Sequence, residues 1–203
     1  MSDPRARPLD DADLDPDPLR QFERWFAEAR ELPLPEATAL ATATSDGRPS
    51  ARMVLLKGAD EDGFTFFTGY ESRKADELAE NPQAALLFYW HAFGRQVRVE
   101  GAVARVAPEE SDAYFRTRPR LAQLAAWASA QSRPLAGRDE LEGRFAQLEA
   151  EFEGRDVPRP PHWGGYRLVP EAYEFWQHRE NRLHDRFRYT RARENWTVER
   201  LGP

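Results

Sequence analysis

The sequence predicts an α+β domain whose strands form a closed or nearly closed antiparallel β-barrel. Strand-like segments come first and are separated by short turns such as DGRPS and ADEDG. Two or three helical segments follow, around residues 109–118, 120–129 and 138–153, and the chain then returns to strands. Strands grouped towards both ends of a chain, with helices between them, are typical of this architecture rather than of alternating parallel units.

The chain begins with about 16 residues rich in Asp and Pro, which we expect to form a flexible arm. A helix is predicted to begin after Asp17, a good N-cap residue, with Pro18 at its first position. Apolar residues recur at helical spacing from Leu19 to Ala29, so this helix is expected to pack on the core. We expect residues 17–203 to form a single domain, because a chain of 203 residues does not require two.

Apolar patterns predict the individual strands. The first three, TALATATS, ARMVLLKG and FTFFTG, form a meander of hairpins. A short helix is expected from about Ser72 to Asn81, followed by QAALLFYWH, whose continuous apolar run suits a strand buried on both faces. The strands expected after it are RQVRVEGAVARV, GGYRLVP, AYEFWQH, RLHDRFRY and WTVERL.

Composition excludes several classes of function. The formal charge of −6 disfavours a general nucleic-acid or membrane surface, and the lack of cysteine excludes disulfides and thiolate metal sites. No apolar run reaches the ~20 residues of a membrane span and no secretory signal is present, so a cytoplasmic location is expected. Phosphate-binding loops, dinucleotide-binding fingerprints and common hydrolase motifs are absent. The four histidines lack a metal-ligand spacing, so no metal site is expected.

The motif YESRKADELAEN is the first candidate binding site. If Ser72 caps the helix, Arg73 and Lys74 occupy its first turn, where positive charge opposes the helix dipole. A bound phosphate would remove this conflict, because free backbone N–H groups and two cations would converge on it. Side chains that extend into solvent would explain the motif as readily.

Four further segments carry groups that suit an anion. Arg52 and Lys57 lie near the ends of the strand SARMVLLKG, and Gln96 lies on the polar face of GRQVRVEG. Tyr114 and Arg118 are four residues apart on one helical face. Interpreted as a strand, RLHDRFRY places on one face the side chains of Arg182, His184, Arg186 and Arg188. Each segment alone is typical of a solvated surface, but together they indicate a ligand with several negative groups, or two ligands.

Nine segments of the chain carry a more specific pattern. They are RMVLLKG, YESRKADELAENP, ALLFYWH, RQVRVEG, YFRTRPR, WASAQS, VPRPPHWGGYRL, EFWQ and RLHDRFRY. In order and spacing they resemble the pyridoxamine 5′-phosphate oxidase family, from about residue 16 to the C-terminus. Nine ordered motifs are far more specific than one short motif.

The resemblance implies a homodimeric, antiparallel split β-barrel with peripheral helices and with FMN at the subunit interface. It also implies oxidation of pyridoxamine or pyridoxine 5′-phosphate to pyridoxal 5′-phosphate, with O2 reoxidising the flavin. The FMN-binding positions that it implies are Arg52, Lys57, Phe67, Thr68, Arg73, Lys74, Gln96, Gln131, Ser132, Trp176 and Arg186. Those implied for substrate are Lys57, Tyr114 and Arg118 on the phosphate, and Arg182 and His184 as the catalytic pair that orients the reacting carbon.

Several departures from the family pattern bear on the substrate. Ala122 stands where Ser is usual, which removes a hydroxyl donor to the substrate phosphate, and one such bond is worth about ten- to a hundred-fold in affinity. Ala125 replaces a usual Gly, and Gly94 replaces an acidic residue. The N-terminal arm offers only Arg5 and Arg7 where the family often has Arg-Arg-x-Tyr.

Two other interpretations stay open. One is a related flavin oxidase of secondary metabolism, of the phenazine-biosynthesis type, which the Ala122 departure favours slightly. The retained Lys57, Tyr114 and Arg118 argue against it, because a substrate without phosphate does not need them. The other is a flavin-binding split-barrel protein without turnover, which would not need Arg182 and His184.

Overall fold

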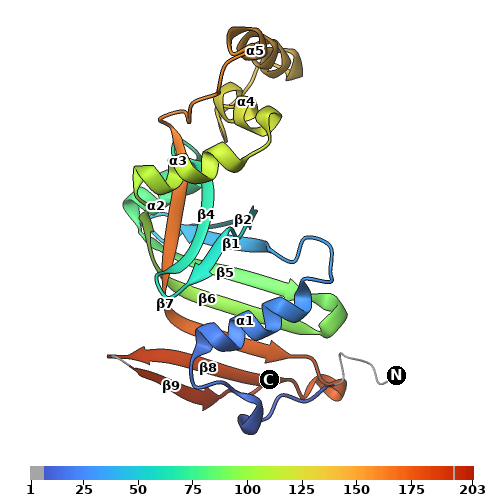
Figure 1. Ribbon diagram of the computed structural model, residues 1–203. Helices are drawn as coiled ribbons and strands as arrows, with labels where there is room; N and C mark the ends of the chain where they lie inside the picture. Colours follow the sequence, from blue (N-terminus) through green and yellow to red (C-terminus); the bar gives the residue numbers. More distant parts are fainter. Residues whose placement is uncertain (1–6, 194) are drawn as a thin grey trace.

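Nine strands form one curled antiparallel sheet in the computed structural model, which describes residues 7–193 and 195–203 (Figure 1). The strands are β1 (Ala37–Ala43), β2 (Pro49–Leu55), β3 (Gly58–Asp60), β4 (Gly63–Gly69), β5 (Gln83–Trp90), β6 (Arg95–Arg105), β7 (Trp163–Gln177), β8 (Asp185–Ala192) and β9 (Asn195–Arg200). Their order is β2-β1-β5-β6-β7-β4-β3, and β8 and β9 extend from β7. The predicted α+β split-barrel class is confirmed.

Strand β7 is the longest strand and organises the sheet. It pairs with β6 along one edge, and on its other edge with β4 through Trp163–Leu168 and then with β8 through Ala172–Gln177. The register with β6 shifts between Glu100 and Gly101, where Pro170 lies opposite. A proline has no N–H to donate, and a bulge is where a sheet tolerates one. The segments GGYRLVP and AYEFWQH, predicted as two strands, therefore form one continuous strand.

Within the described residues, five α-helices accompany the sheet. They are α1 (Pro18–Ala29), α2 (Arg73–Glu80), α3 (Pro108–Thr117), α4 (Arg120–Ala128) and α5 (Arg138–Glu151). Helix α1 begins as predicted, because the Asp17 side chain accepts a hydrogen bond from the Leu19 N–H at 2.9 Å. It covers the core of the sheet, where the Phe22 ring lies 5.1 Å from Phe88 and the Trp25 ring 5.3 Å from Phe175.

Helices α3, α4 and α5 lie at the end of the molecule where β7 begins, and α5 projects farthest from the sheet (Figure 1). They form a second, smaller core around Phe115, Leu124, Val157 and Trp163. No residue of α5 is buried. These helices therefore build one wall of a recess beside β4 rather than cover the main core.

Two strand predictions were wrong in detail. Strand β5 is buried on one face only: Phe88 is fully buried, whereas Tyr89 is 55 % exposed, because the other face of β5 belongs to the outer surface of the sheet. Strand β8 begins at Asp185, so Arg182 and His184 precede it, and Arg182 ends a short 3-10 turn, Glu180–Arg182. Asn181 and Arg182 have positive φ angles, which a strand does not allow.

The described part of the N-terminal segment, residues 7–16, packs against β8. Leu9 is buried, and its N–H donates to Asp185 Oδ2 at 3.1 Å. The Tyr189 hydroxyl donates to the Asp15 carbonyl at 2.8 Å. Arg5, considered above, lies outside the described residues. Within those residues, no helix has the length and apolar character needed to cross a membrane.

The close approach of β6 and β7 at the bulge generates a stability prediction. A Cβ added at Gly101 would collide with the Val169 carbonyl oxygen, a backbone atom that cannot swing away. We expect Gly101→Ala to lower the free energy of unfolding by at least about 2 kcal/mol. Denaturant titration at fixed protein concentration measures it.

Gly143→Ala is the matched control. Gly143 lies inside α5, and beyond the backbone of that helix and the two adjacent residues no described atom lies within 4 Å of an added Cβ. The substitution should therefore raise the free energy of unfolding by about 0.5–1 kcal/mol. Equal effects of the two substitutions would contradict the assigned role of the bulge.

Candidate functional site

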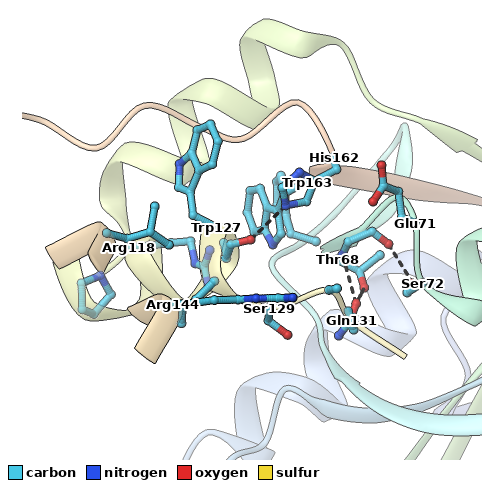
Figure 2. Close-up of a pocket in the computed structure, with 18 of the residues that line it drawn as sticks. Thr68, Glu71, Ser72, Arg118, Trp127, Ser129, Gln131, Arg144, His162 and Trp163 are labelled. Carbon is cyan, nitrogen blue, oxygen red and sulfur yellow. Dashed lines mark hydrogen bonds between the residues drawn. The ribbon is translucent and has the colours of Figure 1, made fainter. Parts of the chain in front are cut away.

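A cavity of about 820 Å³ lies between strand β4, the start of β7 and the helices α3, α4 and α5. Figure 2 shows Thr68, Ser72 and Gln131 on one side of it and Arg118 and Arg144 on the other. The predicted site residues that line it are Lys57, Phe67, Thr68, Tyr114, Arg118 and Gln131. The fold therefore brings the three residues implied for the substrate phosphate to one cavity.

Aromatic stacking holds the wall of this cavity. The Tyr114 ring stacks on Phe67 with 4.0 Å between centroids, and Phe67 stacks on Trp163 at 5.5 Å. The Arg118 guanidinium lies over the Trp163 ring, 4.6 Å from its centroid. Such packing restricts these side chains to the orientations that point along the wall.

One nitrogen of the Arg118 guanidinium lacks a hydrogen-bond acceptor in the described chain. Its Nη1 is buried and has no partner among the described residues. Burial lowers the pKa of Arg118, and the nearby Tyr114 opposes that shift. An unpaired buried donor on a charged group is costly, and an anion in the cavity would relieve it. The i, i+4 spacing from Tyr114 predicted that Arg118 lies in the helix. In the structure α3 ends at Thr117, and Arg118 follows its last turn.

A second, smaller cavity of about 430 Å³ lies between strand β2, the end of β4 and the start of α2. The predicted FMN residues that line it are Arg52, Phe67, Thr68, Arg73, Lys74, Gln131 and Ser132. Phe67, Thr68 and Gln131 line both cavities, so the two spaces adjoin. We call this second space the cation pocket, after Arg52, Arg73 and Lys74.

Lys74 is the most buried cation of the cation pocket. It is only 6 % exposed and donates to Thr68 Oγ1 at 2.9 Å, Ser72 Oγ at 3.0 Å and Gln131 Oε1 at 3.1 Å. Burial lowers the pKa of Lys74 to about 8, with a further contribution from Arg52, while Glu77 opposes the shift. Lys74 makes no ion pair with any residue that the structure describes, so an anion in this pocket would stabilise its charge.

Ser72 lies at the N-cap position of α2, as predicted, but its hydroxyl does not cap the helix. The hydroxyl donates instead to the Gly69 carbonyl at 2.7 Å. In the described chain, the amide N–H groups of Arg73 and Lys74 have no acceptor. The first turn of α2 therefore keeps two backbone donors beside three cations, an arrangement that suits a phosphate.

Glu77, which the sequence analysis did not single out, connects two of these cations. It is 3 % exposed; its Oε1 accepts from Arg73 Nε at 2.8 Å and its Oε2 from Arg52 Nη2 at 3.1 Å. Burial by itself raises the pKa of Glu77, but hydrogen bonds from Ser50, Thr42, Arg73 and Arg52 outweigh it and lower the pKa to about 2. The only sequence signal for this role was the i, i+4 spacing from Arg73.

The remaining predicted FMN residues form a separate group. Gln96, Trp176 and Arg186 occupy directly paired positions on β6, β7 and β8, so their side chains share one face of the sheet. Arg186 donates to Glu174 Oε1 through Nε and Nη2, both at 3.0 Å, and to the Gly202 carbonyl at 2.7 Å. We call this set, with His184 and Arg182 beside it, the outer-face group.

His184 has a defined orientation next to Trp176. Its ring lies 4.5 Å from the Trp176 ring and 5.3 Å from the ring of His178. The Arg179 N–H donates to His184 Nδ1 at 3.1 Å, so the neutral ring carries its proton on Nε2. Burial, His178 and Arg182 lower the pKa of His184. Because Nδ1 accepts this hydrogen bond, the neutral ring offers one N–H donor, at Nε2.

The cation pocket and the outer-face group belong to opposite faces of the sheet. Arg52 is paired with Leu40, which faces the core together with Leu86. Gln96 is paired with Tyr89, which faces outwards. Because successive side chains alternate between faces, Arg52 and Gln96 point away from each other within one chain. The fold thus assembles the predicted site in two separate halves.

The departures noted in the sequence are unequally placed. Ala125 lines the large cavity, whereas Ala122 is half-buried in α4 and is not among the described residues that line it. The expected loss of a phosphate contact at Ala122 therefore has no support from the cavity geometry. Gly94 has a φ of 58° at the end of the 3-10 turn His91–Phe93, a left-handed conformation that glycine adopts without strain.

Comparisons with known proteins agree with this geometry. The family described as "Pyridoxamine 5'-phosphate oxidase" matches residues 26–151, and the "Pyridoxine 5'-phosphate oxidase C-terminal dimerisation region" matches residues 163–203. A pyridoxine/pyridoxamine 5'-phosphate oxidase of Rubrobacter xylanophilus is 63 % identical over 191 residues, which cover 93 % of this chain and 88 % of the relative. One of Paraburkholderia phymatum is 56 % identical, covering 96 % and 93 %.

A solved structure extends the likeness to three dimensions. The structure of PhzG from Burkholderia lata 383, in complex with tetrahydrophenazine-1-carboxylic acid, superposes with a TM-score of 0.91 at 36 % identity. The match covers 98 % of this chain and 100 % of that one. Since the first family match spans more than half of the sequence and the Rubrobacter relative covers 93 % of it, the chain belongs to the pyridoxamine 5′-phosphate oxidase family.

Proposed function

We propose that this chain is an FMN-dependent oxidase that converts pyridoxamine 5′-phosphate, pyridoxine 5′-phosphate or both to pyridoxal 5′-phosphate, with O2 as electron acceptor. The observation that carries the proposal is the pair of adjoining cavities, each with its own cations, which share Phe67, Thr68 and Gln131. Two neighbouring anion sites suit two phosphate-bearing molecules in contact. A phosphorylated cofactor and a phosphorylated substrate meet that requirement.

FMN fits the groups that are present. The cation pocket offers Arg52, Arg73, Lys74 and two free amide N–H groups for a phosphate. Phe67 at the shared wall provides aromatic surface, and Gln131 and Ser132 provide polar groups at its edge. Gln96 and Trp176, on the outer face, add an amide and a second aromatic surface. Bound FMN supplies the acceptor for two electrons from the substrate, and the chain supplies binding and orientation.

Substrate orientation falls to two sets of residues. Lys57, Tyr114 and Arg118 hold the substrate phosphate, and the unpaired Arg118 Nη1 provides a donor for it. Arg182 and His184 hold the other end of the substrate, where the reacting carbon lies. His184 acts there through its Nε2–H as a hydrogen-bond donor, because Nδ1 is occupied by the Arg179 N–H. Orientation of the reacting carbon is the contribution that these residues make to the rate.

The protein forms a homodimer through its C-terminal dimerisation region, and we propose that the flavin lies at that subunit interface. Residues 163–203, the dimerisation region, contain Trp176, Arg182, His184 and Arg186. Because the outer-face group and the cation pocket point away from each other in one chain, one flavin reaches both only when two chains meet. Each site would then take its cation pocket from one protomer and its outer-face group from the partner.

A phenazine-type oxidase is the second candidate, since PhzG superposes closely on this chain. Two observations favour the vitamin B6 reaction instead. Relatives named for that activity reach 63 % identity, against 36 % for PhzG. Lys57, Tyr114 and Arg118 also meet at one cavity, and a carboxylic acid without phosphate would not need all three. A flavin-binding protein without turnover would not need the oriented His184.

The direct test is turnover by the purified protein. We expect a yellow protein that releases FMN on acid denaturation and consumes O2 with pyridoxamine or pyridoxine 5′-phosphate. Oxygen uptake and pyridoxal 5′-phosphate absorbance measure it. A yellow protein that is inert with both compounds would refute the proposed activity, and oxidation of a reduced phenazine acid alone would establish the second candidate.

Arg118→Met tests the assignment of the substrate phosphate. Loss of a charge-assisted hydrogen bond should raise KM for the phosphorylated substrate by about ten- to a hundred-fold, with FMN affinity unchanged. Arg116→Met is the control, because Arg116 is exposed in the last turn of α3, two residues before Arg118, and does not line the cavity in the described chain. Equal KM values for the two variants would refute the assignment of Arg118 to the substrate phosphate.

Mixed dimers test the interface. Lys74→Met disables the cation pocket and Arg186→Met the outer-face group, so each homodimer should be inactive at limiting FMN. If each site combines two protomers, mixed dimers regain one intact site, and an equal mixture should reach about a quarter of the wild-type activity. If the mixture, after subunit exchange, is no more active than the separate variants, one chain supplies both the cation pocket and the outer-face group of a site.

The pKa of Lys74 predicts how FMN binding depends on pH. Below pH 8 the ammonium is charged, and above pH 8 the free protein loses that charge, so FMN affinity should fall about tenfold between pH 7 and pH 9.5. Fluorescence quenching of FMN measures the affinity. Riboflavin lacks the phosphate, so its affinity for the wild type should not fall over this pH range. The affinity of the Lys74→Met variant for FMN should not fall either. An equal decrease in either case would assign the pH dependence to another group.

A further inference from the structure

Glu77 links two of the three cations of the cation pocket, Arg52 and Arg73. Its carboxylate is buried between α2 and the strands β1 and β2 and accepts four hydrogen bonds. Arg73 binds Oε1, while Ser50, at 2.6 Å, Thr42 and Arg52 bind Oε2. Each oxygen thus carries one arginine, and the two arginines come from different elements.

The contacts of Glu77 determine which donors stay available to a ligand. Arg73 uses only Nε for Glu77, and its terminal Nη1 and Nη2 have no acceptor within the described chain. The Arg73 side chain is 63 % exposed, so without Glu77 nothing in the structure directs it towards the pocket. Arg52 is held more firmly, because its Nη1 also donates to the Leu40 carbonyl at 3.2 Å and to Thr42 Oγ1 at 2.5 Å.

Charge balance agrees with a phosphate as the missing partner. Arg52, Arg73 and Lys74 carry three positive charges, and Glu77 with its lowered pKa carries one negative charge. The pocket therefore retains about two positive charges, and a phosphate monoester carries about −1.5 to −2 at pH 7. Glu77 lies on the side of the arginines that faces the protein interior, which leaves the cavity side to the ligand.

We propose that Glu77 is a positioning residue for the FMN phosphate, which it serves by directing Arg73 and Arg52 into the cation pocket. The inference rests on the proposed placement of the FMN phosphate in that pocket. Glu77 does not touch the ligand; it acts through the two guanidinium groups. A second role would have the opposite sign, since an anion near a phosphate site also weakens the attraction for phosphate.

Glu77→Gln separates these two roles. The amide keeps the shape of the side chain but can accept at one atom only, so it cannot hold both arginines. Positioning predicts that FMN affinity of the apoprotein falls about tenfold or more, while riboflavin affinity changes less than about threefold. Titration of the full-length apoprotein by flavin fluorescence measures both, and circular dichroism checks the fold.

Asp76→Asn is the matched control. Asp76 lies next to Glu77 on α2, and the substitution removes the same charge, but its partner is the half-exposed Arg133 at 3.1 Å. FMN affinity of Asp76→Asn should stay within about twofold of the wild type. A loss as large as that of Glu77→Gln would show that charge on α2, rather than the Glu77 contacts, determines the affinity.

Glu77→Asp decides the matter if Glu77→Gln does not fold. The aspartate keeps the charge and shortens the side chain by one methylene, so positioning predicts a loss of FMN affinity, and a purely electrostatic role predicts none. The inference is overturned if Glu77→Gln binds FMN more tightly, if FMN and riboflavin weaken equally, or if Glu77→Asp matches the wild type. Wild-type protein that binds FMN and riboflavin with equal affinity would instead refute the placement of the phosphate.

Discussion

The pairing of β7 with three neighbours separates the two halves of the site. One edge of this strand is paired with β6 throughout, and the other edge changes partner from β4 to β8. The change occurs around Pro170, which has no N–H for a ladder and faces the bulge at Gly101. The cavities lie on the β4 side of this point, and the outer-face group lies on the β8 side.

Buried carboxylates organise the cations in both halves of the site. Glu77 binds Arg52 and Arg73, and Glu174, also 3 % exposed, binds Arg186 at 3.0 Å and Arg98 at 2.8 Å. A buried ion pair gives little net stability, because desolvation offsets most of the attraction between the charges. Its effect here is geometric, since a carboxylate with several donors restricts the orientation of each long side chain.

With the flavin at the subunit interface, as proposed, the opposite orientation of the two halves would give the dimer a role in the chemistry. A monomer would expose its cations and its Trp176 surface on different faces, with no position at which one ligand touches both. The cation pocket also carries an excess of positive charge that burial makes unfavourable, as the low pKa of Lys74 indicates. Cofactor binding and subunit contact would each supply what the isolated chain lacks, and we expect them to be coupled.

The sequence by itself determined the local elements and the family. Its signals were short-range: the cap at Asp17, the hairpin turns, the helix after Ser72 and the order of nine motifs. They predicted the split barrel and some of the residues that line the two cavities. It misjudged the start of β8, because residues 182–184 alternate like a strand, yet Asn181 and Arg182 adopt positive φ angles.

Only the tertiary structure decided the relations between distant residues. The division of the site between two faces follows from the register of six strands, and the proposed role of Glu77 follows from contacts with residues 25 to 35 positions away. Arg118 Nη1 and the first amides of α2 have no partner in the described part of the chain, and this too depends on what surrounds them. Periodicity reports which face a residue occupies within its own element, but pairing between elements depends on packing of the whole chain.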